Sequence, residues 1–105
     1  MKKRKSFPLP LSNKKTKEMY IILVYDIGVE RVSKMLKLCR QYLNWIQNSV
    51  FEGEITESQL RELKMKAKKI MDCETDSLII FISKNQKWLQ KEIVGKEKND
   101  TDIFI

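Results

Sequence analysis

MYIILVY (residues 19–25) is an unbroken apolar run rich in β-branched and aromatic side chains. Continuous apolarity, rather than alternation of apolar and polar residues, is typical of a central strand that is covered on both faces. The run is followed by Asp26-Ile27-Gly28, which has the chemistry of a turn. The pattern therefore predicts a buried central strand that ends near Asp26.

Two later stretches have the helical period. In residues 30–42 the apolar side chains recur three and four positions apart, at Val32, Met35, Leu36 and Cys39. A second helix is expected to begin at a cap supplied by Thr56 or Ser58. Its buried stripe consists of Leu60, Leu63, Ala67 and Ile70.

The remaining regular segments are strand-like. Residues 44–54 have strand composition, but Asn48-Ser49 interrupts them, so they are expected to form a bent hairpin or a bulged strand. Residues 77–83 form a second apolar run. The order β-α-β(β)-α-β predicts an α+β fold, a ferredoxin-like βαββαβ sandwich with two helices on one face of an antiparallel sheet. The other face of that sheet would be bare and apolar, which favours a homodimer.

Charge is distributed unevenly along the 105 residues. Residues 1–18 carry seven basic residues and one acidic residue, whereas residues 19–105 carry fourteen and thirteen. We interpret residues 1–18 as a disordered basic extension and residues 19–105 as one ferredoxin-like domain. Met19 is either the true start of the protein, or the extension is a basic arm that touches nucleic acid.

Composition excludes several classes of function. The chain has no histidine, which excludes Ser-His and Cys-His catalysis and His-ligated zinc. Its two cysteines, Cys39 and Cys73, lie in no metal-ligand spacing and are expected to be small core residues. No apolar run is long enough to span a bilayer, so we expect a cytoplasmic protein without membrane contact.

Asp26 is the candidate for chemistry, because it stands at the carboxyl end of the central strand. A carboxylate on a rigid strand end is suited to metal binding, although a turn or cap residue is the alternative interpretation. Two copies of Asp26 close to a two-fold axis, with water and a phosphate oxygen, would hold Mg²⁺. Such a metal would polarise the phosphate or activate water for phosphodiester cleavage.

A basic ridge and several aromatic residues are candidates for nucleic-acid contact. Arg31, Lys34 and Lys37 lie three residues apart, off the apolar stripe of the first helix, and could grip phosphates or form a solvated face. Stacking on bases and burial in the core are the two roles open to Trp45, Phe51 and Trp88, and we favour the core for Phe51.

These segments together resemble the family of CRISPR-associated protein two, the small subunit of the CRISPR adaptation machinery. The resemblance is carried by MYIILVYDI (residues 19–27), WIQNSVFEG (residues 45–53) and DSLIIFI (residues 76–82), each in its place in the order. It covers residues 19–105. Two departures are present: Trp45 stands where many relatives have arginine, and Glu30-Arg31 stands where many have two arginines.

The resemblance implies a ferredoxin-like homodimer in which the C-terminal segment adds a strand to the partner's sheet. It implies that Asp26 binds the metal at the dimer interface, with Mg²⁺ as cofactor (Mn²⁺ as an alternative). Tyr25 and Phe51 match positions of the family. It further implies metal-dependent cleavage of RNA or double-stranded DNA, and a partnership with the CRISPR integrase (CRISPR-associated protein one) in spacer acquisition.

Three hypotheses about function follow. The chain is a metal-dependent endonuclease, an endoribonuclease or endodeoxyribonuclease, of the CRISPR adaptive-immunity system. Alternatively, it is a non-catalytic scaffold that holds DNA in the integration complex. The third hypothesis is a regulatory or toxin-type module that shares only the fold, because one fold supports many functions.

Overall fold

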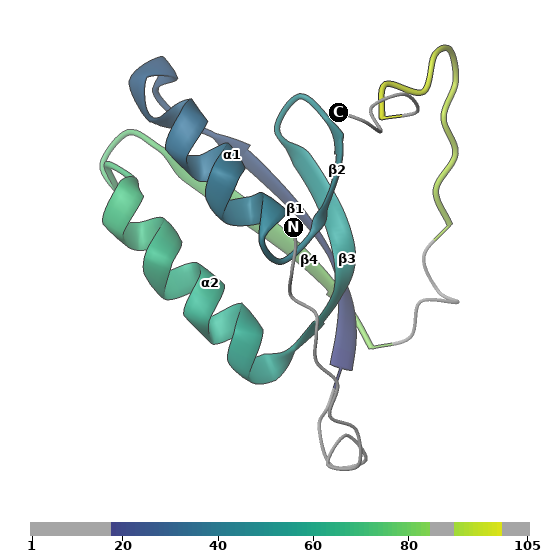
Figure 1. The fold of residues 1–105 in the computed structure, drawn as a ribbon, viewed down its shortest axis with the longest axis horizontal. Coiled ribbons are helices and arrows are strands. Elements are labelled where there is room, and N and C mark those ends of the chain that lie inside the picture. Colours follow the sequence, from purple (N-terminus) through teal and green to yellow (C-terminus); the bar gives the residue numbers. More distant parts are fainter. Residues whose placement is uncertain (1–17, 85–89, 100–105) are drawn as a thin grey trace.

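The computed structural model describes residues 18–84 and 90–99. Its elements follow the predicted βαββαβ order, with a short 3-10 turn before the first helix (Figure 1). They are β1 (Glu18–Asp26), the 3-10 turn η2 (Val29–Arg31), α1 (Val32–Arg40), β2 (Asn44–Gln47), β3 (Val50–Thr56), α2 (Glu57–Ile70) and β4 (Ser77–Ser83).

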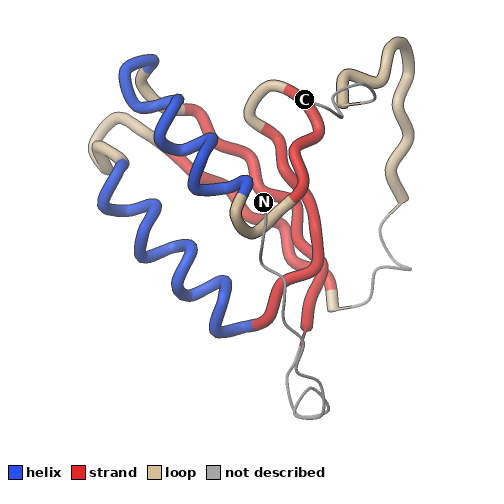
Figure 2. The backbone as a smooth tube through the Cα atoms, in the orientation of Figure 1, coloured by secondary structure: helices blue, strands red, loops and turns tan. Residues whose placement is uncertain are grey.

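The four strands form one antiparallel sheet in the order β2-β3-β1-β4. Both helices lie on the same side of this sheet, and the described C-terminal residues lie on the other side (Figure 2). β1 is an inner strand, and its Leu23 is paired with Phe51 of β3 and with Ile80 of β4. The predicted α+β sandwich and the inner position of residues 19–25 are therefore confirmed.

The core lies between the helices and the sheet. Ile21 and Leu23 are 0% exposed and Tyr25 is 4% exposed, because alternate residues of β1 face the helices. The helices insert part of their predicted stripes: Met35 and Cys39 of α1 are buried, as is the row Leu60, Leu63 and Ala67 of α2. Val32 and Leu36 are only half-buried, and Leu38, which the predicted stripe left out, is buried instead. The intervening residues of β1 face away from the helices, so in the single chain only one face of this strand is covered.

The predicted hairpin forms with its turn at Asn48 and Ser49. Asn48 has φ +45°, in the left-handed region that asparagine tolerates better than most residues. The indole Nε1 of Trp45 donates to the Asn48 carbonyl oxygen at 3.0 Å, and the Tyr25 amide donates to the Ser49 carbonyl oxygen at 3.1 Å. The hairpin turn is therefore attached to the end of β1 that carries Asp26.

α2 begins with a complete capping box. The Thr56 hydroxyl accepts the Gln59 amide at 3.1 Å, and the Gln59 side chain accepts the Thr56 amide at 3.0 Å. Of the two caps that the sequence allowed, Thr56 is the one used.

Thr56→Ala is expected to destabilise the domain by about 1 kcal/mol, because the Gln59 amide loses its acceptor. In a domain of this size that corresponds to a fall in melting temperature of about 4–8 °C. Thermal unfolding followed by circular dichroism measures it, with Ser58→Ala as the matched control. Equal melting temperatures of Thr56→Ala and wild type would contradict the assignment.

Several predictions fall at the edges of the described part. Residues 1–17 of the predicted extension and Trp88 lie outside it, and Glu18, assigned to that extension, is the first residue of β1 and pairs with Thr56. Residues 90–99 form no strand in the single chain. The extra C-terminal strand was expected on the sheet of a second copy, so it stays a prediction.

Candidate functional site

Asp26 is the last residue of β1 and its register partner is Ser77, the first residue of β4. Its side chain is exposed and follows Ile22 and Val24 along the face that the helices leave free. Within residues 18–84 and 90–99, no group of three or more acidic, cysteine or histidine side chains is placed to hold a metal ion. Asp26 is thus a single accessible carboxylate at a rigid strand end.

The helix-free face of the sheet is apolar next to Asp26. Ile22 pairs with Phe81, and Val24 pairs with Ile79. Ile79 is 50% exposed and Phe81 is 56% exposed, so the edge strand β4 presents two large apolar side chains side by side with β1 on this face. We call these four residues the open face.

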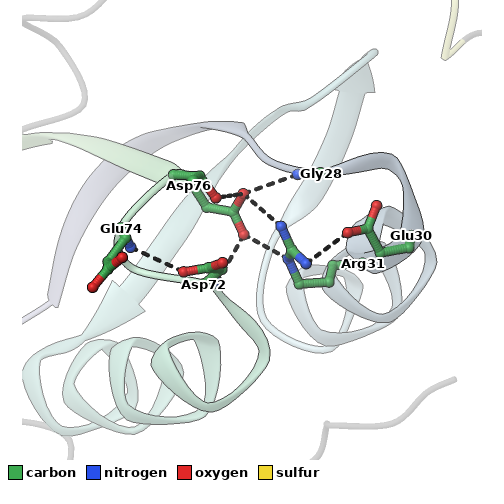
Figure 3. Close-up of polar contacts among 7 residues, drawn as sticks. Gly28, Glu30, Arg31, Asp72, Glu74 and Asp76 are labelled. Atoms are coloured by element: carbon green, nitrogen blue, oxygen red, sulfur yellow. Dashed lines mark hydrogen bonds and ion pairs between the residues drawn. The ribbon is translucent and has the colours of Figure 1, made fainter.

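A buried carboxylate lies beside the turn that follows Asp26. The Asp76 side chain is 2% exposed and receives hydrogen bonds from the Gly28 amide at 2.9 Å and the Asp72 amide at 2.9 Å. It also pairs with Arg31, whose Nε lies 2.7 Å from Oδ2 and whose Nη2 lies 3.0 Å from Oδ1 (Figure 3). We call Gly28, Arg31, Asp72 and Asp76 the Asp76 cluster.

The Asp76 cluster compensates the cost of burying a charge. Hydrogen bonds from the Arg31 guanidinium, which approaches as a bidentate fork, hold the pKa of the Asp76 carboxyl well below its usual range. The Asp72 and Gly28 amides act in the same direction, against the effect of burial. The carboxylate is therefore ionised throughout the neutral range and joins the β1–α1 turn to the α2–β4 loop.

This cluster predicts a specific acid dependence of stability. A carboxyl whose pKa is lowered by folding stabilises the fold fully above its unfolded pKa of about 4, and the contribution is lost as the pH falls below that value. We expect wild type to melt about 5–10 °C above Asp76→Asn near neutral pH. The difference should stay constant down to about pH 5 and shrink below about pH 4. Differential scanning calorimetry across this range measures it, and a difference that grows in acid would contradict the assignment.

The three residues of the predicted basic ridge differ in their surroundings. Lys34 and Lys37 are exposed and, among the described residues, make no ion pair. Arg31 is half-buried and pairs with Asp76 and with Glu30, whose Oε2 lies 2.8 Å from Nη1. Lys34 and Lys37 are thus free to meet phosphates, whereas the guanidinium of Arg31 is already engaged inside the protein.

The family-matched aromatic residues lie in the core. Phe51 is 0% exposed, as its core interpretation expected, and its ring stacks on Tyr25 at 6.0 Å between centroids. Burial raises the pKa of the Tyr25 hydroxyl. Trp45 is partly buried, and the Arg40 guanidinium lies 6.0 Å from its ring centroid, within the range of a cation–π contact. The positive charge next to this position therefore comes from Arg40 at the end of α1, rather than from residue 45 itself.

The two cysteines differ from each other. Cys39 is fully buried, and burial raises the pKa of its thiol to about 12, so it is a core residue rather than a nucleophile. Cys73 is exposed in the α2–β4 loop, contrary to the expectation that both cysteines are core residues. Neither helix of the described chain has the length and apolar character needed to cross a membrane.

The sequence pointed to Asp26, Lys34 and Lys37 but missed the Asp76 cluster. The sequence patterns assign no role to Asp72 or Asp76, and 45 residues separate Arg31 from Asp76. No periodicity or motif spacing within the sequence connects positions so far apart. The one available signal is local: Asp76 directly precedes an apolar run, and an ionised side chain that is buried beside such a run needs a partner.

Comparison with known proteins places these features in a family. Residues 19–91 match the family model described as CRISPR associated protein Cas2. The CRISPR-associated endoribonuclease Cas2 of Pyrococcus furiosus is 48% identical over 87 residues, which cover 83% of this chain and 100% of that protein. The protein of the same name from Methanothermobacter thermautotrophicus is 41% identical over 87 residues, covering 83% of this chain and 96% of its own.

Solved structures agree with this. A crystal structure of Cas2 with 47% sequence identity superposes with a TM-score of 0.72 and covers 77% of this chain and 91% of its own. The Streptococcus pyogenes Cas2 crystal structure at pH 6.5 has 31% identity and a TM-score of 0.65, with 73% of this chain and 100% of that chain covered. Both the sequence and the backbone geometry therefore match the same set of proteins.

Proposed function

The chain belongs to the Cas2 family of CRISPR-associated proteins, and we propose that it is a metal-dependent endoribonuclease that works as a homodimer in the adaptation stage of CRISPR immunity. The observation that carries the proposal is the position of Asp26. It is an exposed carboxylate on a rigid strand end, and it borders an apolar face suited to a second copy.

The open face supports the homodimer. Two large side chains that are half exposed, beside two more apolar residues, would be removed from water if a second copy packed against this face. The C-terminal segment lies on the same side of the sheet, where Lys91 pairs with Glu52 of β3. Glu52 also accepts the Tyr20 hydroxyl at 2.6 Å. This side of the sheet thus offers an apolar surface for a second copy and a carboxylate, Glu52, that binds polar groups of the C-terminal segment and of β1.

The donor chemistry of Asp26 fits a divalent cation. Mg²⁺ is commonly bound by one or two carboxylates, with water and substrate phosphate oxygens completing its shell. Asp26 from each of two copies would supply those carboxylates. When bound, Mg²⁺ or Mn²⁺ supplies Lewis-acid polarisation of the phosphate or activates water.

The other residues of the chain have simpler tasks in this proposal. Lys34 and Lys37 attract and orient the phosphate backbone through charge. Tyr25 and Phe51 stack in the core directly behind the strand end and keep β1 rigid. We assign these two aromatic residues to support of the site rather than to contact with substrate.

A second function is favoured by the charge of the helices. α1 and α2 together carry eight basic and two acidic residues, although residues 19–105 as a whole are close to neutral. Such a positive layer suits the phosphate backbone of a DNA duplex. We therefore propose that the protein also holds DNA beside the CRISPR integrase during spacer acquisition, and this role does not require cleavage.

Cleavage assays on the full chain test the proposed enzyme. Labelled single-stranded RNA and double-stranded DNA are incubated with the purified protein in Mg²⁺, in Mn²⁺ or in EDTA. We expect cleavage of RNA that depends on the metal. If the dimeric protein binds DNA but cleaves neither substrate, the nuclease proposal fails and the DNA-holding role remains.

A further inference from the structure

The Asp76 cluster restrains the backbone next to Asp26 on β1 and next to its register partner Ser77 on β4. β1 ends at Asp26, and the amide of Gly28, two residues farther along the chain, donates a hydrogen bond to the Asp76 carboxylate. Asp76 lies just before β4 and directly precedes Ser77, which is the register partner of Asp26. One buried carboxylate therefore restrains the chain immediately after Asp26 and the chain immediately across from it (Figure 3).

We propose that Asp76 and Arg31 are positioning residues for cleavage, because their ion pair sets where the carboxylate of Asp26 stands. This inference rests on the proposed nuclease function. It also changes the role of Arg31, which the sequence assigned to phosphate contact. Through Nε and Nη2, its guanidinium holds Asp76, and through Nη1 it holds Glu30.

Two features of the geometry support positioning over phosphate contact. The Nε and Nη2 bonds to the two oxygens of Asp76 form a bidentate fork, which constrains direction as well as distance. Moreover, a Cβ placed on Gly28 would lie 2.5 Å from Arg31 Nη2, so the turn and the guanidinium are in close contact. A change at one member of the cluster therefore shifts the others.

The two roles of Arg31 predict opposite results for Asp76→Asn. If Arg31 mainly contacts phosphate, removing its internal partner frees a cation, and RNA binding should tighten. If the pair positions Asp26, kcat should fall about tenfold or more while KM stays within about twofold, since misplacement of a catalytic group by about 1 Å is costly. Arg31→Lys separates the roles further, because it keeps the charge but loses the fork. It should resemble Asp76→Asn.

The experiment combines kinetics with hydrogen exchange on the full chain, well below the melting temperature. Wild type, Asp76→Asn, Arg31→Lys and the control Glu62→Gln are compared with single-stranded RNA and Mg²⁺. Glu62 forms only an exposed pair with Lys66 at 3.6 Å, away from the Asp76 cluster. We expect amide exchange to rise about tenfold in residues 26–31 and 72–77 of both cluster variants, and nowhere else.

The possible results each support or overturn the positioning role of the Asp76–Arg31 pair. Unchanged kcat, or tighter RNA binding with faster cleavage, in Asp76→Asn overturns the proposal. If Asp76→Asn does not fold, Gly28→Ala serves instead, because it displaces the Arg31 end without removing a charge. An inactive wild type overturns the nuclease proposal alone. In that case hydrogen exchange alone tests whether the Asp76 cluster restrains the backbone beside Asp26. Exchange that is unchanged in the variants, or that rises uniformly along the chain, would overturn that role.

Discussion

Replacing Asp26 with asparagine is expected to lower metal-dependent RNA cleavage about a hundredfold or more. The substitution keeps the shape of the side chain but removes the negative charge that attracts a divalent cation. Because the side chain is exposed at the end of β1, the melting temperature should stay within about 2 °C of wild type. Initial cleavage rates over a range of Mg²⁺ concentrations measure the effect.

A carboxylate elsewhere on the same side of the sheet is the matched control. Glu54 is exposed on β3 and pairs in register with Tyr20, near the opposite end of β1. Glu54→Gln removes the same charge from the same side of the sheet and should leave cleavage within about twofold of wild type. Equal losses in the two variants would mean that general charge, rather than the position of Asp26, governs the activity.

The predictable part of this fold is its local periodicity. An uninterrupted apolar run made residues 19–25 recognisable as an inner strand, and the spacing of Leu60, Leu63 and Ala67 gave the buried side of α2. Both patterns arise from nearest neighbours along a strand or a helix, so they are readable without tertiary information. The prediction of Asp26 as the site carboxylate arises in the same way, from its place at the end of the apolar run.

The unpredictable part depends on contacts between distant segments. Arg31 lies on the exposed side of its helix by spacing alone, yet the α2–β4 loop brings Asp76 against it. The apolar run of β1 also suggested cover on both faces, whereas the single chain covers only the face with Leu23. In both cases the missing information lies outside the local pattern: Asp76 is 45 residues away from Arg31, and the face of β1 opposite Leu23 has no helix against it in the single chain.

If the proposed homodimer forms through the open face, replacing Phe81 with glutamate is expected to convert it into monomers. Phe81 is 56% exposed in the single chain, and burying a phenylalanine contributes about 1.5–3 kcal/mol. In a two-fold dimer the loss occurs in both copies, and a carboxylate in an apolar interface adds a desolvation cost. The dissociation constant should therefore rise about a thousandfold or more. Sedimentation equilibrium at micromolar concentrations measures it.

Met65 on the outer side of α2 provides a control with the same exposure, 56%. Met65→Glu introduces the same charge at a site of equal accessibility on the helical layer, and it should leave the dimer intact. If Met65→Glu separated the copies and Phe81→Glu did not, the interface would lie on the helices and the proposed pairing of Asp26 residues would fail.

The Phe81 variant also tests whether the nuclease site needs two chains. Its fold should persist, because the altered side chain lies on the open face and not in the helix-covered core. If the metal is held by Asp26 from both copies, monomers lose cleavage together with dimerisation, and activity recovers only at concentrations that restore the dimer. Full cleavage by a stable monomer would show that one Asp26 is sufficient, and that the apolar face serves assembly rather than chemistry.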